Sequence, residues 1–198
     1  MSIRSRSISA SAVLAFAVLL AGGESGPSFA QAQPGVAAGR PEVRRHVDAD
    51  RGRVWWLSEA GLFVQETGRT ARTELALPGW DVAREPYSCL PDLALGPRGD
   101  ALVTSNVTST LWRIDARTLA VTVHRLALDS DRDKDVGFTG LVYSPAQAAF
   151  FAVSGPHGTL WRIDPQLTSA RKVEQSALLR GACGLASGPI SDRLKEAQ

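Results

Sequence analysis

The sequence predicts an all-β protein, a partial β-propeller of about three four-stranded blades plus an incomplete fourth. The hexapeptide Thr-Leu-Trp-Arg-Ile-Asp occurs at Thr110–Asp115 and again, 49 residues later, at Thr159–Asp164. Between the copies lie short apolar runs rich in Val, Leu, Phe and Trp, separated by Pro, Gly and Asp, which is typical of strands joined by turns. Helical periodicity is weak throughout. Four short strands in a period of this length indicate the blade of a propeller.

The two copies of the repeat align beyond the hexapeptide. Corresponding positions share an apolar or a turn-forming residue, and the alignment places one extra residue in the loop before the second hexapeptide. The expected pairs are Leu93 with Leu141, Pro97 with Pro145, and Leu102-Val103 with Phe150-Phe151.

Two further copies are partial. Upstream, Phe63 stands 49 residues before Trp112 and is expected to be its counterpart in a first blade. Downstream, Gly184–Pro189 matches Gly140–Pro145 and opens a fourth copy that ends in polar sequence. Within each hexapeptide the Leu, Trp and Ile are expected to pack the blade, and the Asp is expected to open a turn.

The first thirty residues have the layout of a secretory signal peptide. Arg4 and Arg6 supply positive charge, an apolar run follows from Ala10 to Ala21, and residues 28–30 form a small-x-small cleavage site. A run of about twelve residues is too short to cross a hydrocarbon core of about 30 Å. We therefore expect a periplasmic or secreted protein with no membrane anchor after cleavage.

The remaining chain divides by composition. We expect a flexible N-terminal segment at 31–42, the repeat domain at 43–189 and a polar C-terminal tail at 190–198. The formal net charge is only +2, and the arginines near the start of the repeats are interleaved with carboxylates. A chain with this charge pattern is not built to bind a polyanion, so we expect neither nucleic acid nor an anionic membrane as a partner.

Cys89 and Cys183 are the two cysteines of the chain. In an oxidising compartment paired thiols tend to form disulfides, and two cysteines allow one intramolecular pairing. Such a bridge would close a separation of 94 residues and contribute about 4 kcal/mol if unstrained. Free buried thiols, an intermolecular bridge and a redox pair are the alternatives.

Two long segments carry a family resemblance. "PDLALGPRGDALVTSNVTSTLWRID" and "TGLVYSPAQAAFFAVSGPHGTLWRID" resemble blades of SMP-30/gluconolactonase-like and NHL-like propellers, and the resemblance covers roughly Val43 to Pro189. It bears on the fold more than on function, because the repeated residues are those that build blades. Lactonases of the SMP-30 type hold one divalent cation, such as calcium, with a Glu, two Asn and an Asp placed before the first strands of several blades.

Asp92 is the one metal ligand that this resemblance carries over. Pro91-Asp92 is retained, but Thr139 and Cys183 stand where the lactonases have Asn. A hard cation needs several oxygen ligands, which one carboxylate does not supply. The alternative is that Asp92 caps a turn. No catalytic residue is predicted.

Other polar motifs are weaker. The acidic run Asp129–Asp135 resembles a calcium loop in its alternating carboxylates, but Val136 stands where the sharp turn of such loops needs Gly, which favours a solvated loop. His46, His124 and His157 lack the spacing of metal ligands. His157 lies between Gly-Pro and Gly on a predicted loop tip, where a binding partner is often contacted.

Aromatic residues suggest both packing and docking. Phe63, Trp112 and Trp161 recur at one position of the repeat, which favours packing between blades over a ligand platform. Trp55 and Trp56 are neighbours on a predicted strand, so their side chains point to opposite faces. One of the two is therefore expected to be exposed and to dock a partner.

Blade number completes the functional prediction. Propellers usually have about four to eight blades, and three blades with the start of a fourth leave sheet edges and one face open to association. The sequence therefore predicts an exported, non-catalytic binding or accessory protein that engages a protein partner or a second copy of itself. The alternatives are a metal-dependent lactonase or hydrolase of the SMP-30 type, completed by dimerisation, and a degenerate truncated paralogue.

Overall fold

The computed structural model describes residues 44–83, 89–129, 137–175 and 179–185. The chain divides into two compact units, Met1–Ala37 and Ala38–Gln198, and all described residues lie in the second. The predicted signal peptide, the segment 31–42 and the tail 190–198 lie outside the described residues. Within the described ranges, no helix has the length and hydropathy needed to cross a bilayer.

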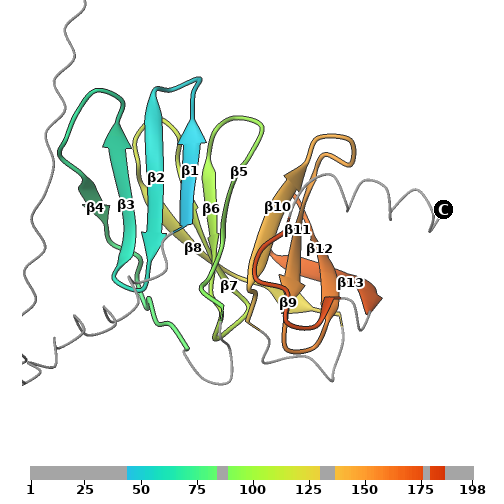
Figure 1. The fold of residues 1–198 in the computed structure, drawn as a ribbon. Coiled ribbons are helices and arrows are strands. Elements are labelled where there is room, and N and C mark those ends of the chain that lie inside the picture. The colour runs from blue at the N-terminus through green and yellow to red at the C-terminus, as the bar shows by residue number, and fades with distance from the viewer. Residues whose placement is uncertain (1–43, 84–88, 130–136, 176–178, 186–198) are drawn as a thin grey trace, which may run out of the picture. The chain divides into compact units, whose positions relative to one another are not determined.

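Three sheets follow one another along the chain (Figure 1), which confirms the predicted all-β fold of blade-like sheets. The first contains β1 (Arg44–Asp48), β2 (Arg53–Ser58), β3 (Gly61–Glu66) and β4 (Thr73–Leu75). The second contains β5 (Leu93–Leu95), β6 (Ala101–Thr104), β7 (Thr110–Ile114) and β8 (Val121–Arg125). The third contains β10 (Gly140–Ser144), β11 (Ala149–Ser154), β12 (Thr159–Ile163), β13 (Ser169–Gln175) and the short β9 (Ala127–Leu128). Within each sheet, consecutive strands from the first to the fourth are antiparallel.

Strand β9 gives the third sheet a fifth strand, which the repeat did not predict. It follows β8 of the second sheet and pairs in parallel with β13, with Ala127 opposite Ser169. Beyond it, the Asp129 carboxylate accepts the backbone N–H of Lys172 at 2.9 Å. The chain that leaves the second sheet thereby covers the outer edge of the third and satisfies an edge that would otherwise be open.

The strand register corrects the predicted alignment by one residue. Trp112 pairs with Val103, and Trp161 pairs with Ala152. Val103 therefore corresponds to Ala152, and the predicted match with Phe151 is wrong. Both faces of β6 and β11 are largely buried, so apolar character alone did not fix the register, although a shift of one residue reverses every side chain.

The extra residue of the third sheet lies in its first hairpin and not before the hexapeptide. Leu95 pairs with Ala101 in the second sheet, whereas Tyr143 pairs with Phe150 in the third, a turn longer by one residue. The loops that precede the two hexapeptides are equal in length, because Thr104 pairs with Leu111 just as Val153 pairs with Leu160.

Adjacent sheets pack face to face through alternating side chains. The Trp and Ile of each hexapeptide face the preceding sheet. Leu111 of the first copy faces the third sheet, and Leu160 of the second copy packs with Leu179 and Leu185. One core cluster joins the first and second sheets and contains Trp55, Leu57, Leu62, Val103, Trp112 and Ile114. A second joins the second and third sheets and contains Leu102, Leu111, Phe138, Ala152, Trp161 and Ile163. The predicted role of the hexapeptide in packing is confirmed.

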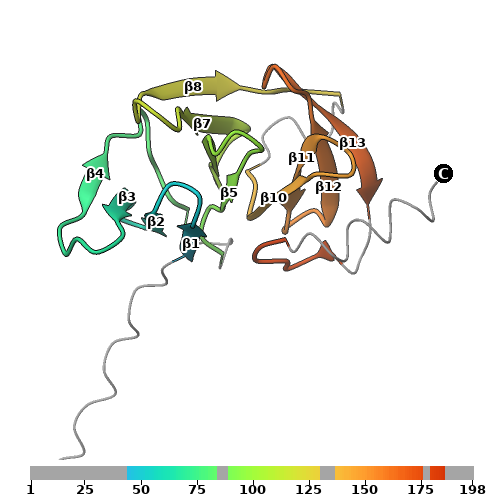
Figure 2. The same cartoon turned by 90° about the horizontal axis from the view of Figure 1, so that it is seen from above.

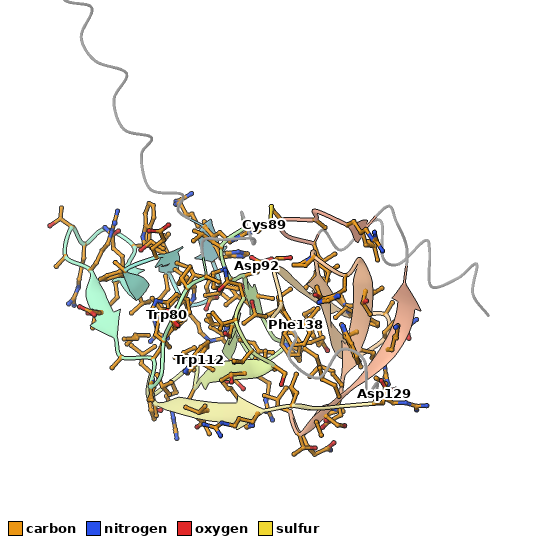
Figure 3. The ribbon with its side chains drawn as sticks, turned by 90° about the horizontal axis from the view of Figure 1, so that it is seen from below. Trp80, Cys89, Asp92, Trp112, Asp129 and Phe138 are labelled. Atoms are coloured by element: carbon orange, nitrogen blue, oxygen red, sulfur yellow. A yellow bond between two sulfur atoms is a disulfide. The ribbon has the colours of Figure 1, made fainter. Side chains whose placement is uncertain are left out.

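Trp112 shows how one of these side chains is held. Its ring is 1% exposed and meets the ring of Trp80 edge to face, with centroids 5.3 Å apart. Its indole N–H donates to the carbonyl of Pro78 at 3.0 Å, and Figure 3 shows the two tryptophans together. The segment that leads out of the first sheet therefore closes over the Trp of the second.

The Asp of each hexapeptide opens a turn, as predicted. The Asp115 carboxylate accepts the backbone N–H groups of Arg117 at 3.0 Å and Thr118 at 2.7 Å. The Thr118 backbone hydrogen bond, with the Thr118 hydroxyl and Arg117, lowers the pKa of Asp115 to about 2. Asp164 holds the corresponding turn through the N–H groups of Gln166, at 2.7 Å, and Thr168, at 3.0 Å.

The first strands of the three sheets lie on the inside. β1 contacts β5, and β5 contacts β10. In Figure 2 these strands lie inward of β4, β8 and β13. The residues just before and within the first strands are thus brought close together from distant parts of the sequence.

We expect Trp112→Ala to lower the free energy of unfolding by about 3–5 kcal/mol, because it empties a fully packed position. Phe63, at the same position of the first sheet, pairs with Trp56 on a partly exposed face. Phe63→Ala should therefore cost about 1 kcal/mol or less. Urea denaturation followed by far-ultraviolet circular dichroism measures both. Equal losses would contradict the assignment of the two faces.

Candidate functional site

Buried and partly buried polar residues gather at the inner strands. We call Arg44, His46, Asp92 and Thr139 the polar centre. Arg44 and His46 belong to β1, Asp92 lies directly before β5, and Thr139 lies directly before β10. The three sheets therefore each contribute to it, and Figure 3 marks its place by Asp92.

The Asp92 carboxylate is the centre's main acceptor. Its residue is 4% exposed. Oδ1 accepts the backbone N–H of Leu93 at 2.9 Å, and Oδ2 accepts the backbone N–H of Leu141 at 2.8 Å. Arg44 Nε lies 3.6 Å from Oδ1, and His46 Nε2 lies 4.0 Å from it. One carboxylate thus contacts groups from all three sheets.

These contacts bear on the predicted metal site. Both Asp92 oxygens are engaged by backbone N–H donors, and a guanidinium stands where a cation would have to approach. Over the described ranges, no three His, Cys, Asp or Glu residues are grouped so as to hold a metal ion. The position of Asp92 suits the alternative of a cap on backbone N–H groups, and its role as a metal ligand stays a prediction.

Arg44 and His46 complete the centre. Arg44 Nη2 donates to the carbonyls of Leu90 and Thr139, both at 3.4 Å. Burial lowers the pKa of His46 from its ordinary value; the Asp92 charge opposes this shift and the Arg44 charge adds to it. His46 is therefore neutral at physiological pH. Sequence spacing gave no signal for this cluster, because its members come from three repeats.

The predicted disulfide is present. Cys89 and Cys183 are joined across 94 residues, with their Cα atoms 5.2 Å apart. Beside it, the backbone N–H of Gly184 donates to the Thr139 carbonyl at 2.9 Å. The bridge therefore attaches the start of the fourth copy to the segment that enters the second sheet. The rest of the fourth copy lies outside the described residues.

Asn106 fixes the same entering segment from the other side. Its amide nitrogen donates to the carbonyls of Ala83 at 2.8 Å and Cys89 at 3.0 Å, and its amide oxygen accepts the N–H of Ala83 at 3.1 Å. Asn106 heads an Asn-Val-Thr sequence of the kind that accepts glycans, but the residue is 0% exposed. In the folded protein it is a structural side chain.

The two neighbouring tryptophans face opposite ways. Trp55 is 0% exposed and packs in the core between the first and second sheets. Trp56 lies on the other face of β2 and is half-buried. Only Trp56 of the pair is accessible to a partner, and its docking role stays a prediction.

A partly exposed apolar face surrounds Trp56. We call Val47, Val54, Trp56 and Phe63, with the flanking Arg45, Arg72 and Glu74, the outward face of the first sheet, whose net charge is therefore +1. The Arg45 and Arg72 guanidinium carbons lie 5.4 Å and 4.0 Å from the Trp56 ring centroid. Val47 is 55% exposed. Among the described residues, no further sheet packs against this face.

The remaining candidates are separate from both sites. His157 lies in the turn between β11 and β12 and is half-buried, and its docking role stays a prediction. Of the acidic run Asp129–Asp135, residues 130–135 lie outside the described residues. Asp129 is exposed and accepts the Lys172 N–H, as an edge contact.

We expect Asp92→Asn to lower the free energy of unfolding by about 2–4 kcal/mol, because it leaves the partly buried Arg44 without its counter-charge. Asp50→Asn is the control: Asp50 is exposed in the turn between β1 and β2, so the change should cost less than about 0.5 kcal/mol. Chemical denaturation of the two variants at pH 7 compares them. A difference smaller than the error of the measurement would show that Asp92 does not join the sheets.

We also expect acid to destabilise the protein from about pH 6.5 downward. A folded-state pKa of His46 below its ordinary value of 6.5 means that the unfolded chain binds more protons in this range, so stability falls as pH falls. Arg44 and Asp92 face His46 in the folded state. His46→Gln should reduce this slope without abolishing it, because burial also lowers the pKa of His124. Melting temperatures between pH 8 and pH 5 measure the slope; an unchanged slope in the variant would refute the assignment.

Comparison with known proteins extends to the fold alone. No protein-family model and no curated protein matches the chain. Among solved structures, a streptogramin B lyase aligns with a TM-score of 0.50 and 14% identity, over 69% of this chain and 42% of that one. YCF48 bound to D1 peptide aligns with a TM-score of 0.43 and 13% identity, over 74% and 43%. A virginiamycin B lyase from Staphylococcus aureus aligns with a TM-score of 0.40 and 14% identity, over 70% and 57%. This chain therefore spans about half the length of these structures or less, and its three sheets match the blades of propeller proteins.

Proposed function

We propose that this chain is an exported, non-catalytic binding or accessory protein, and that it docks a protein partner through the outward face of its first sheet. The observation that carries the proposal is the position of Phe63. In the second and third sheets the corresponding Trp112 and Trp161 are buried against the preceding sheet. In the first sheet Phe63 at the same position is partly exposed, on a face that also carries Val47, Val54 and Trp56.

The chemistry of this face suits protein recognition. Tryptophan and arginine are the residues most enriched among those that dominate binding energy at interfaces. Arg45 and Arg72 both lie over the Trp56 ring. A partner that brings apolar side chains bordered by carboxylates would bury the exposed part of the ring and pair the arginines.

A second copy of this chain fits the face less well. Its complementary surface would be the far face of the third sheet, whose Phe151 and Leu160 are buried beneath the partly buried Leu179 and Leu185. That face also carries Arg162 opposite Arg171. Head-to-tail pairing would bring these arginines to the face that carries Arg45 and Arg72, and like charges brought together oppose association. We therefore assign the face to a different, acidic partner.

The rival function is a metal-dependent lactonase of the SMP-30/gluconolactonase type, with a degenerate paralogue as a further alternative. The lactonase function requires Asp92 to ligate a cation. The denaturation comparison of Asp92→Asn separates the two functions when it is repeated with millimolar calcium. A metal site would stabilise the wild-type protein and not the variant, because a ligand that binds only the folded state raises its stability.

The docking proposal is tested by placing a photo-crosslinking phenylalanine analogue at position 56 of the exported protein and identifying the adduct in producing cells. With the purified partner, Trp56→Ser should weaken binding by about 30-fold or more, as expected for a central interface residue. Val123→Ser is the matched control: Val123 is 40% exposed on β8, away from this face, and its change should leave the affinity unaltered.

Light scattering on the wild-type protein gives the second arm of the test. A monomer is expected. A mass of two copies that falls to one in Trp56→Ser would identify a second copy as the occupant of the face. Equal affinities of Trp56→Ser and Val123→Ser for the crosslinked partner, or a monomer that yields no adduct, would overturn the proposal.

A further inference from the structure

We propose that a cavity between the second and third sheets binds a small carboxylate with an apolar body. The cavity has a volume of about 260 Å³ and opens among the turns that join β5 to β6, β10 to β11 and β12 to β13. Its lining includes Arg98, Asp100 and Arg113 from the second sheet, and Tyr143 and Phe150 from the third. It is separate from the polar centre and from the outward face, so this proposal does not depend on the docking function.

One wall of the cavity is apolar and aromatic. Tyr143 and Phe150 meet edge to face, with ring centroids 5.0 Å apart. Gly96 lies beside them, and a Cβ atom at that position would come within 3.1 Å of Phe150 Cζ. The Gly therefore lets the turn approach the ring. A wall of this kind accommodates an aliphatic chain or a phenyl ring.

The other wall carries two guanidinium groups and one carboxylate. Arg113 donates two hydrogen bonds to Asp100 Oδ2, one of them from Nε at 3.1 Å, and the N–H of Ala116 donates to Oδ1 at 3.2 Å. Burial would raise the pKa of Asp100, but these hydrogen bonds and the two arginines lower it overall, so Asp100 is ionised. Arg113 is thus paired with this carboxylate through Nε and Nη2.

Arg98 is the surplus cation. Its Nη2 lies 3.6 Å from the same Asp100 oxygen, and its side chain is 77% exposed. Its backbone carbonyl accepts a hydrogen bond from Arg51, which fixes the turn that carries it. Arg51 is itself paired with Asp48, at 3.5 Å. This wall therefore has a net charge of +1. The surplus charge belongs to Arg98, whose exposed side chain lies at the mouth of the apolar cavity and is free to turn toward an anion.

This charged pair is not a general feature of the repeat. Arg162 of the third sheet has the register position of Arg113, but Ala149 stands where the second sheet has Asp100. In the first sheet, Val64 occupies the position of Arg113. Among the three described sheets, only the second thus combines the two charges, and it does so at the interface that contains the cavity.

These features define the ligand class. One surplus positive charge beside an apolar wall favours a single carboxylate attached to an aliphatic or aromatic group of a few carbon atoms. A charge-assisted hydrogen bond from a guanidinium is about twice as strong as one between neutral groups. Asp100 repels a second carboxylate, and the two arginines repel an amine.

Phenylacetate and its neutral analogue phenylacetamide test the site. In a titration of the full-length protein followed by ligand-observed NMR, phenylacetate should bind about tenfold more tightly than the amide. Hexanoate should compete with it. Arg98→Gln should weaken phenylacetate binding about tenfold and leave phenylacetamide unchanged, and Arg98→Lys should restore part of the loss. Arg162 is the exposed arginine of the second hexapeptide, at the position of Arg113, and it lies outside the cavity. Arg162→Gln should therefore leave the affinities for both ligands unchanged.

Three results would overturn the proposal. One is the absence of phenylacetate and hexanoate binding at about 10 mM, where even a weak small-molecule site is occupied. Another is equal affinity for the acid and the amide, which would show that no cation selects the ligand. The last is equal weakening by Arg98→Gln and Arg162→Gln, which would attribute binding to overall charge.

Discussion

The carboxylate of Asp92 is the interaction on which the arrangement of the inner strands depends. It accepts a backbone N–H at the start of its own sheet and another at the start of the third, and it pairs with Arg44 of the first. A buried ion is stable only when its hydrogen-bonding capacity is used and a counter-charge is near. Here the capacity is used by groups from three repeats, so the cost of burying this carboxylate is offset only when the three sheets are in place. The same engagement makes Asp92 a poor candidate for holding a cation.

Around this centre, the second and third sheets are held by further contacts in addition to their face-to-face packing. The disulfide attaches the start of the fourth copy to the segment that enters the second sheet. Asn106 holds that segment from the other side through three hydrogen bonds. Strand β9 carries the chain of the second sheet onto the outer edge of the third. The cavity between these two sheets therefore has walls fixed at both the inner and the outer strands, which is the condition for a preformed ligand site.

The sequence predicted the fold class, the repeat, the role of the hexapeptide and the disulfide, because each depends on local strand patterning or on a single possible pairing. It misplaced the register of β11 by one residue, since both faces of that strand are apolar. Neither the polar centre nor the cavity was predictable. Arg44 and His46 lie in the first repeat and Asp92 lies in the second, and only the packing of β1 against β5 brings them together. In the sequence, Arg98, Asp100 and Arg113 look like ordinary surface residues. Their proposed role in binding follows from the aromatic wall that the third sheet places beside them.

A position in a repeat does not have a fixed role, because its environment is completed by the neighbouring sheet. Trp112 and Phe63 stand at the same point of the blade, yet the first is covered by the preceding sheet and the second lies on a partly exposed face. Arg113 and Arg162 occupy the same point of the hexapeptide, yet one pairs with a carboxylate at a cavity and the other is exposed. Blade packing accounts for the shared residues. It does not fix those positions whose neighbouring sheet differs or lies outside the described residues. Two candidate binding surfaces lie at positions that the packing of neighbouring sheets does not determine. One is Trp56 with its two arginines, and the other is the cavity beside Arg98.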